Sequence, residues 1–94
     1  MNPILKIHEK DNVGTCLKTI VRNNKFDVDT ITITAKENIP QYHKIALVDI
    51  PLHGPVIKYG QMIGLATKAI EQGEYVHVHN MESTRGRGDK KEGF

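Results

Sequence analysis

The chain has 94 residues, enough for one compact domain but too few to surround a substrate on all sides. This size excludes a two-lobed enzyme with a cleft of its own, so catalysis would require a partner chain or an oligomer. A net charge of +2 without a basic run before Arg85 argues against nucleic-acid binding, and a single cysteine excludes an internal disulfide.

The composition favours β-structure. Residues that suit a pleated surface, Ile, Val and Thr, outnumber Ala and Leu almost three to one. Because Ala and Leu are among the best helix formers, we expect a mainly β domain with one or two short helices.

In the first part of the chain, alternation over residues 5–7 predicts a short strand. Residues 13–21 then carry apolar side chains at helical spacing, which predicts a short helix capped by Asp11 or Asn12. The apolar positions of this expected helix are Val13, Leu17, Ile20 and Val21. Residues 28–35 follow as the clearest strand, with isoleucines on one face and threonines on the other.

In the second part, residues 44–50 are apolar on both faces, which is typical of a central strand. A proline-containing loop leads to shorter strands over residues 56–59, 62–66 and 75–79. Residues 83–94 are polar and rich in glycine, so we expect a domain over residues 1–82 and a flexible tail.

A faint internal repeat appears at an offset of 31 residues. The positions that match are Ala35, Ile39, Gln41, Ile45 and Leu47 in the first copy, and Ala66, Ile70, Gln72, Val76 and Val78 in the second. In both copies the sequence predicts a polar turn followed by an apolar strand. The repeat predicts two similar hairpin-like units clasped together, unless the matches arise by chance.

The segment Tyr75–Asn80 contains the most suggestive local pattern. On a strand, Tyr75, His77 and His79 would share one face, and Val76 and Val78 would be buried on the other. The two imidazoles would then stand roughly 6.6 Å apart at Cα and could converge on one metal ion. The alternative is a solvated strand face.

Three other side chains have both a functional and a structural reading. His43 at the mouth of a strand could relay a proton, or lie in an exposed turn beside Lys44. Lys58 could bind an anionic substrate, or simply extend its ammonium into water. Cys16 lies among apolar residues, which favours a buried thiol over a nucleophile.

Several short motifs, taken in order, resemble the N-terminal domain of altronate and D-galactarate dehydratases. They are Ile39-Pro40, His43-Lys44-Ile45-Ala46-Leu47, Val56-Ile57-Lys58-Tyr59-Gly60, Ile63-Gly64, Ala66-Thr67, Gly73-Glu74, Val76-His77 and His79-Asn80. Asp11-Asn12-Val13 is also similar to the opening motif of that family. The family commonly has Gly-His-Lys where this chain has Tyr42-His43-Lys44. The resemblance implies an SAF-type β-clip.

The resemblance also implies a function. Free-standing domains of this kind are small subunits of altronate-type dehydratases or of (R)-sulfolactate sulfo-lyase. The chain would then be the small subunit of a hydro-lyase or carbon–sulfur lyase, inactive alone and completed by a large subunit. The reaction would eliminate water or sulfite from a sugar acid or sulfolactate.

On this reading the site residues fall into two groups. The catalytic residues would be His43, His77 and His79, and the substrate-binding residues would be Lys44, Lys58 and Asn80. Elimination α to a carboxylate needs stabilisation of enolate-like charge. A divalent ion such as Fe, Mn or Mg, shared with the large subunit and contacted by His77 and His79, could supply it.

A non-catalytic SAF-type module that binds an anionic sugar or a partner protein is the rival interpretation. The lone cysteine and the lack of a long apolar stretch predict a cytoplasmic protein without a membrane or nucleic-acid partner. A homo-oligomer is also compatible with the sequence.

Overall fold

The computed structural model describes residues 2–83, which form nine short β-strands and no helix. The strands are β1 (Ile4–Leu5), β2 (Val13–Cys16), β3 (Lys25–Val28), β4 (Ile31–Thr34), β5 (Lys44–Ala46), β6 (Pro55–Lys58), β7 (Gln61–Ala66), β8 (Tyr75–Val76) and β9 (Met81–Ser83). All pairings are antiparallel, in sheets of order β1-β2-β5-β8, β3-β4 and β6-β7-β9. The expected mainly β class is confirmed. A helix that could cross a membrane does not occur in this part of the chain.

The helix expected over residues 13–21 is wrong. Val13–Cys16 is strand β2, which pairs with β1 on one side and with β5 on the other. Beyond it, Leu17 is 38% exposed and Val21 is 55% exposed, so the helically spaced residues do not form one buried stripe. Hydrogen bonds to the two neighbouring strands satisfy the backbone N–H and C=O groups of β2. They stabilise the strand although the spacing of the apolar residues favours a helix.

The central strands separate two hydrophobic cores. The first core comprises Ile4, Cys16, Ile20, Val28, Ile33, Ala35, Ile39, Ile45 and Leu47. The second core comprises Val13, Ala46, Ile50, Val56, Ala66, Ile70 and Val76. Because side chains alternate along a strand, β5 sends Ile45 into the first core and Ala46 into the second. The predicted central strand is confirmed, although it ends at Ala46.

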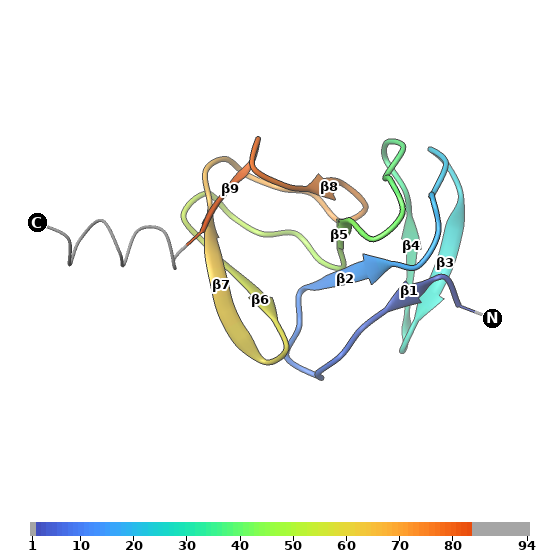
Figure 1. Cartoon of the computed structure of the whole chain (residues 1–94), viewed down its shortest axis with the longest axis horizontal. Helices are drawn as coiled ribbons and strands as arrows, with labels where there is room; N and C mark the ends of the chain where they lie inside the picture. Colours follow the sequence, from blue (N-terminus) through green and yellow to red (C-terminus); the bar gives the residue numbers. More distant parts are fainter. Residues whose placement is uncertain (1, 84–94) are drawn as a thin grey trace, which may run out of the picture.

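Each core is covered by one hairpin. The hairpins β3–β4 and β6–β7 lie at opposite ends of the long axis, with β2, β5 and β8 between them (Figure 1). Residues 28–35, expected as one strand, contain the turn between β3 and β4. The expected faces are confirmed in β4, where Ile33 is buried while Thr32 and Thr34 are exposed.

The internal repeat recurs in the structure at four of its five matched pairs; the fifth pair fails, because Leu47 is buried and Val78 is 78% exposed. Ile20 and Ile39 exchange a pair of backbone hydrogen bonds (2.8 and 2.9 Å), and Ile50 and Ile70 exchange an equivalent pair (both 2.8 Å). The repeated glutamines also match. Gln41 donates to the carbonyl of Leu17 (3.1 Å), and Gln72 donates to the carbonyl of Leu47 (2.9 Å). The domain is therefore built from two similar units clasped about the central strands.

The final predicted strand is shorter than expected. Strand β8 ends at Val76, which is buried as predicted, and residues 77–80 form a turn in which the N–H of Asn80 donates to the carbonyl of His77 (3.0 Å). The predicted burial of Val78 is wrong, because this side chain lies in the turn and is 78% exposed.

The last described strand reaches the position at which the tail was predicted to begin. Ser83 is the last residue of β9 and pairs with Gly64 of β7. The rest of the predicted tail, residues 84–94, lies outside the described residues.

Asp11 and Asn12 join the N-terminal segment to the β6–β7 hairpin instead of capping a helix. The buried carboxylate of Asp11 accepts hydrogen bonds from the N–H of His8 (3.0 Å) and from the N–H of Gly60 (2.8 Å). Asn12 accepts from the N–H of Ile57 (2.7 Å) and donates to a carbonyl of β6 (2.8 Å). These bonds give a structural reason for the opening Asp-Asn pair.

Replacement of Asp11 by Asn should make stability less dependent on acid pH. Burial by itself raises the pKa of the Asp11 carboxyl, but hydrogen bonds from the backbone of Gly60 and His8 outweigh it and lower that pKa. The carboxylate therefore contributes stability above the unfolded pKa of about 3.9, and this contribution is lost as pH falls through the lower folded value.

We expect Asp11→Asn to reduce the free energy of unfolding by about 1–2 kcal/mol at pH 7. The variant should also lack the part of the stability that the unmodified chain loses when the Asp11 carboxylate is protonated. Urea titrations at pH 7 and at pH values on either side of the carboxylate range measure both effects. The control is Glu9→Gln, which neutralises an exposed carboxylate. Identical acid profiles for Asp11→Asn and the unmodified chain would contradict the expectation.

Candidate functional site

Three of the predicted site residues meet in a group of four rings, His43, Tyr75, His77 and His79, which we call the imidazole cluster. The ring of His43 lies 4.9 Å from that of His77 and 5.4 Å from that of Tyr75, measured between centroids. Tyr75 stacks on His77 at 5.6 Å with an interplanar angle of 15°, and lies 5.3 Å from His79. The structure thus brings together histidines from two separate parts of the sequence.

The pairing of β5 with β8 places the two halves of the cluster side by side. In this pairing Ile45 lies opposite Tyr75, so the chain that enters β5 at His43 runs beside the chain that leaves β8 at His77. The turn after β8 then brings His79 back towards Tyr75. The three histidines thus gather around Tyr75, with His79 brought there by the turn and not by strand alternation. The predicted functional role of this group stays a prediction.

Asn80 holds that turn in place. Its side-chain oxygen accepts from the N–H of His77 (2.9 Å), and its side-chain nitrogen donates to the carbonyl of Tyr75 (2.8 Å). The side chain is almost completely buried. Asn80 therefore positions the histidines, and the predicted contact with substrate stays a prediction.

The hydroxyl of Tyr75 forms a short hydrogen bond with Nδ1 of His43 (2.6 Å). Strand alternation predicts Tyr75 beside the two later histidines but indicates no function for it. The contact joins residues that are 32 positions apart, and the only sequence signal for it is the alternation that groups Tyr75 with His77.

Positive charge concentrates around the imidazole cluster. Burial, followed by the nearby charges of His43, Lys44 and His79, lowers the pKa of His77. Burial and the neighbouring ammonium of Lys58 also lower the pKa of Lys44. An imidazole with a lowered pKa is neutral at neutral pH, so His77 is suited to accept a proton, while the lysines favour an anionic ligand.

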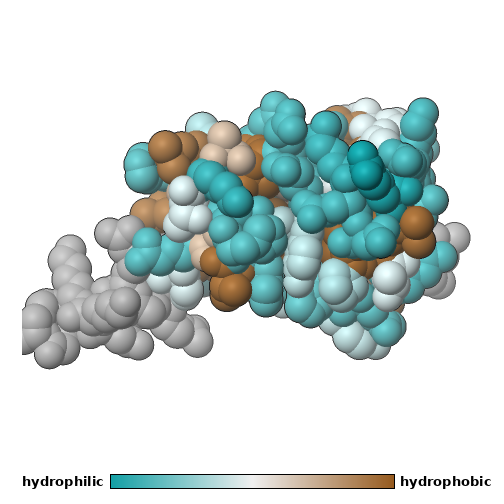
Figure 2. Space-filling model, turned by 90° about the horizontal axis from the view of Figure 1, so that it is seen from above, coloured by the Kyte–Doolittle hydropathy of each residue, from teal (hydrophilic) through white to brown (hydrophobic). Residues whose placement is uncertain are grey.

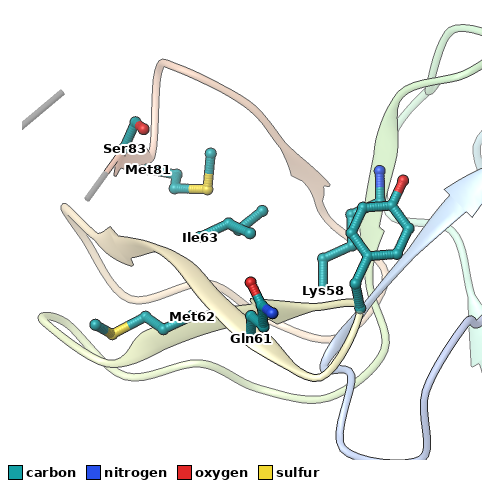
Figure 3. Close-up of a pocket in the computed structure, with 7 residues that line it drawn as sticks. Lys58, Gln61, Met62, Ile63, Met81 and Ser83 are labelled. Carbon is teal, nitrogen blue, oxygen red and sulfur yellow. The ribbon is translucent and has the colours of Figure 1, made fainter. Parts of the chain in front are cut away.

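Lys58 lies where this cationic region meets a hollow between β6, β7 and β9. The hollow has a volume of about 500 Å³ and is lined by Lys58, Tyr59, Gln61, Met62, Ile63, Met81 and Ser83. Figure 3 shows Lys58 at one end and Ser83 at the other, with Ile63 and Met81 between them. The ammonium of Lys58 also lies 4.9 Å from the centroid of the Tyr59 ring. The surface on the β8 side of the molecule is mostly hydrophilic (Figure 2).

Cys16 is confirmed as a buried thiol. It lies in the first core, and burial raises its pKa to about 11. A cysteine acts as a nucleophile in its thiolate form, so this residue is unsuited to that role.

Comparison with known protein families matches residues 2–84 to the altronate/galactarate dehydratase SAF domain. The chain belongs to this SAF domain family. The match runs through both repeat units and includes every member of the imidazole cluster. It confirms the family that the short motifs indicated.

Individual relatives of this SAF domain are lyases. Altronate dehydratase of Bacillus subtilis is 37% identical over 83 residues, which cover 88% of this chain and 17% of the relative. Altronate dehydratase of Escherichia coli is 41% identical over 76 residues, 81% of this chain and 15% of the relative. The (2R)-sulfolactate sulfo-lyase subunit alpha of Chromohalobacter salexigens is 43% identical over 56 residues, 60% of each chain. The chain thus spans about a sixth of the length of the altronate dehydratases that it matches.

Tyr42 stands where the resemblance to the family leads us to expect glycine, and its backbone adopts a conformation that favours glycine. Tyr42 has a φ of 71°, in the left-handed region that glycine adopts without steric cost. Its side chain is 69% exposed, so it does not fill a core position in exchange. A glycine at this position would suit the backbone. The two residues that follow it in the family pattern, His and Lys, are present here as His43 and Lys44.

Nowhere in residues 2–83 are three His, Cys, Asp or Glu side chains arranged to hold one ion. Catalytic metal sites usually take three ligands from protein. The predicted metal shared with a large subunit stays a prediction, and the chemistry below is derived from the side chains alone.

Proposed function

We propose that this chain is the small subunit of a lyase that eliminates water or sulfite from an anionic hydroxy acid, with a separate large catalytic chain as its partner. The observation that carries this proposal is the imidazole cluster beside Lys44 and Lys58. Two lines of comparison support it. The SAF domain family is named after dehydratases, and two relatives are alpha subunits of a sulfo-lyase.

The proposed elimination requires three events at the substrate. The C–H bond α to the carboxylate breaks and its proton passes to a base. The C–O or C–S bond at the next carbon breaks, and a double bond forms between the two carbons. A leaving hydroxide takes up a proton and departs as water, whereas sulfite departs as the anion.

The side chains of the cluster suit parts of this chemistry. His77, neutral because of its lowered pKa, can accept a proton or a hydrogen bond. Lys44 and Lys58 can hold the carboxylate and stabilise the negative charge that develops on it. His43 and His79 would lie beside the leaving group.

The partner chain would provide what this chain lacks. The imidazole cluster lies at the surface of a small domain, with a wide hollow nearby instead of an enclosed cavity. Enolate-like charge is stabilised best where water is excluded, and a large chain packed over the cluster would exclude it. That chain would also provide most ligands of any divalent ion, because no three His, Cys, Asp or Glu side chains of residues 2–83 are grouped to hold one.

We expect the purified 94-residue chain to have no activity towards altronate, galactarate or (2R)-sulfolactate. The chain should be expressed with an affinity tag in its own host, so that the large dehydratase-type chain co-purifies and can be identified by mass spectrometry. The complex should turn over one of the three acids. Product formation by the small chain alone would contradict the proposal that it needs a partner.

The same experiment separates the lyase from a non-catalytic binding module. The two lysines and the histidines would also attract an anionic sugar without any reaction. If the complex binds one of the acids but forms no product, the binding module becomes the better description. If it forms product, the chain is part of an enzyme.

A further inference from the structure

Tyr75 is held through both its backbone and its ring. Its backbone N–H donates to a carboxylate oxygen of Glu37 (3.1 Å), and its carbonyl accepts from the side chain of Asn80 (2.8 Å). Strand β8 fixes it opposite Ile45 of β5. Its ring is stacked on that of His77. The bond from its hydroxyl to His43 is therefore preorganised by the fold.

The direction of this bond follows from the chemistry of the two groups. A phenol is a stronger acid than the N–H of a neutral imidazole, and an imidazole nitrogen is a better acceptor than a phenolic oxygen. In the neutral form of the imidazole, these acidities favour the Tyr75 hydroxyl as the donor and Nδ1 of His43 as the acceptor. The bond made by one ring nitrogen sets the tautomer, so a donor at Nδ1 favours the form that is protonated at Nε2.

The ring and the backbone of His43 are held by different partners. Within the described part of the chain, the Tyr75 hydroxyl is the hydrogen-bond partner of this ring. The backbone of His43 is fixed separately, since its N–H donates to the carbonyl of Pro40 (3.1 Å) and its carbonyl accepts from Cys16 (2.8 Å). The ring orientation thus depends on Tyr75 more than on the local backbone.

We propose that Tyr75 is a positioning residue that holds His43 in the tautomer protonated at Nε2, and so presents an N–H donor to an oxygen of the anionic substrate. The tautomer concerns this chain alone. The kinetic consequence rests on the lyase function proposed above.

The tautomer can be measured on the isolated 94-residue chain. Long-range ¹H–¹⁵N correlation spectra distinguish a protonated from an unprotonated ring nitrogen for each histidine. We expect His43 to carry its proton on Nε2 in the unmodified chain, and to become a mixture of tautomers in Tyr75→Phe. The matched control is Tyr42→Phe, which removes an exposed hydroxyl from the residue next to His43 and should leave the tautomer unchanged.

The outcomes of this measurement are decisive. A proton on Nδ1 in the unmodified chain, or a His43 tautomer that Tyr75→Phe does not change, would overturn the inference. Loss of the folded amide pattern in Tyr75→Phe would overturn it as well, because the residue would then be needed for the fold.

The kinetic arm uses the complex with the large chain. Tyr75→Phe should reduce kcat about tenfold and change KM less than twofold, since a misdirected donor affects the transition state more than substrate binding. Equal kcat values would overturn the catalytic use of the His43 donor. Absence of activity in the unmodified complex would instead count against the proposed function, while the tautomer result would still stand.

Discussion

His77→Ala should reduce kcat/KM of the complex with the large chain by about a hundredfold or more, which is the range for loss of a general acid–base group. The ring of His77 lies within 5.6 Å of the centroids of both Tyr75 and His43, so its loss opens the middle of the imidazole cluster. The melting temperature should change by only a few degrees. The bond between the His77 N–H and Asn80 is made by the backbone and survives the substitution.

The neighbouring residue provides the control for that variant. Val78→Ala alters an exposed side chain in the same turn, so it should change neither kcat/KM nor the melting temperature appreciably. Steady-state assays with the preferred acid, combined with thermal unfolding of both variants, separate the two effects. If His77→Ala keeps more than a third of the unmodified activity, His77 does not belong to the catalytic groups.

Ile39→Ala should reduce the free energy of unfolding by about 2–5 kcal/mol, the range for removing a buried Ile side chain down to Cβ. Ile39 is completely buried in the first core, beside its backbone partner Ile20. A domain of this size is stabilised by only roughly 5–10 kcal/mol in total. A large fraction of the variant molecules should therefore unfold at moderate urea concentrations.

The repeat predicts a similar loss in the second core. Ile70 is the counterpart of Ile39, and Ile70→Ala should cost the same within about 1 kcal/mol because the two side chains are equally buried. Leu52→Ala, at a half-exposed position, should cost less than about 1 kcal/mol. Urea denaturation with comparison of the m-values measures all three. A loss confined to one of the two isoleucines would show that the two units differ in stability.

Patterns within a few residues were predictable from the sequence. The alternation of Ile and Thr identified the buried face of β4, and the two-sided apolar run identified β5 as central. The spacing of the repeat identifies Ile39 and Ile70 as equivalent positions without reference to their backbone partners. The first two features depend on side chains that are close together in the chain, where periodicity reports burial directly, whereas the repeat depends on one pattern that recurs 31 residues later.

Two local predictions failed for different reasons, one because of distant strands and the other because of a side chain just beyond the predicted strand. At residues 13–16 the chain pairs with both β1 and β5, and these hydrogen bonds stabilise a strand where the spacing favoured a helix. After Val76 the side chain of Asn80 accepts a hydrogen bond from His77 and closes a turn, which ends the strand and exposes Val78. The partners of residues 13–16 lie in other strands, and Asn80 lies just after the predicted strand 75–79. Neither contributes to the local alternation of apolar and polar residues.

The sequence by itself therefore determined the β class, the family and the residue types of the candidate site, since all of these depend on composition and on short ordered motifs. The tertiary structure alone decided how those residues meet. The β5–β8 pairing brings His43 to Tyr75 across 32 residues, and the turn after β8 brings His79 back to the same ring. Strand pairing and turn closure are set by the total burial and hydrogen bonding of the whole domain, which a local pattern does not contain.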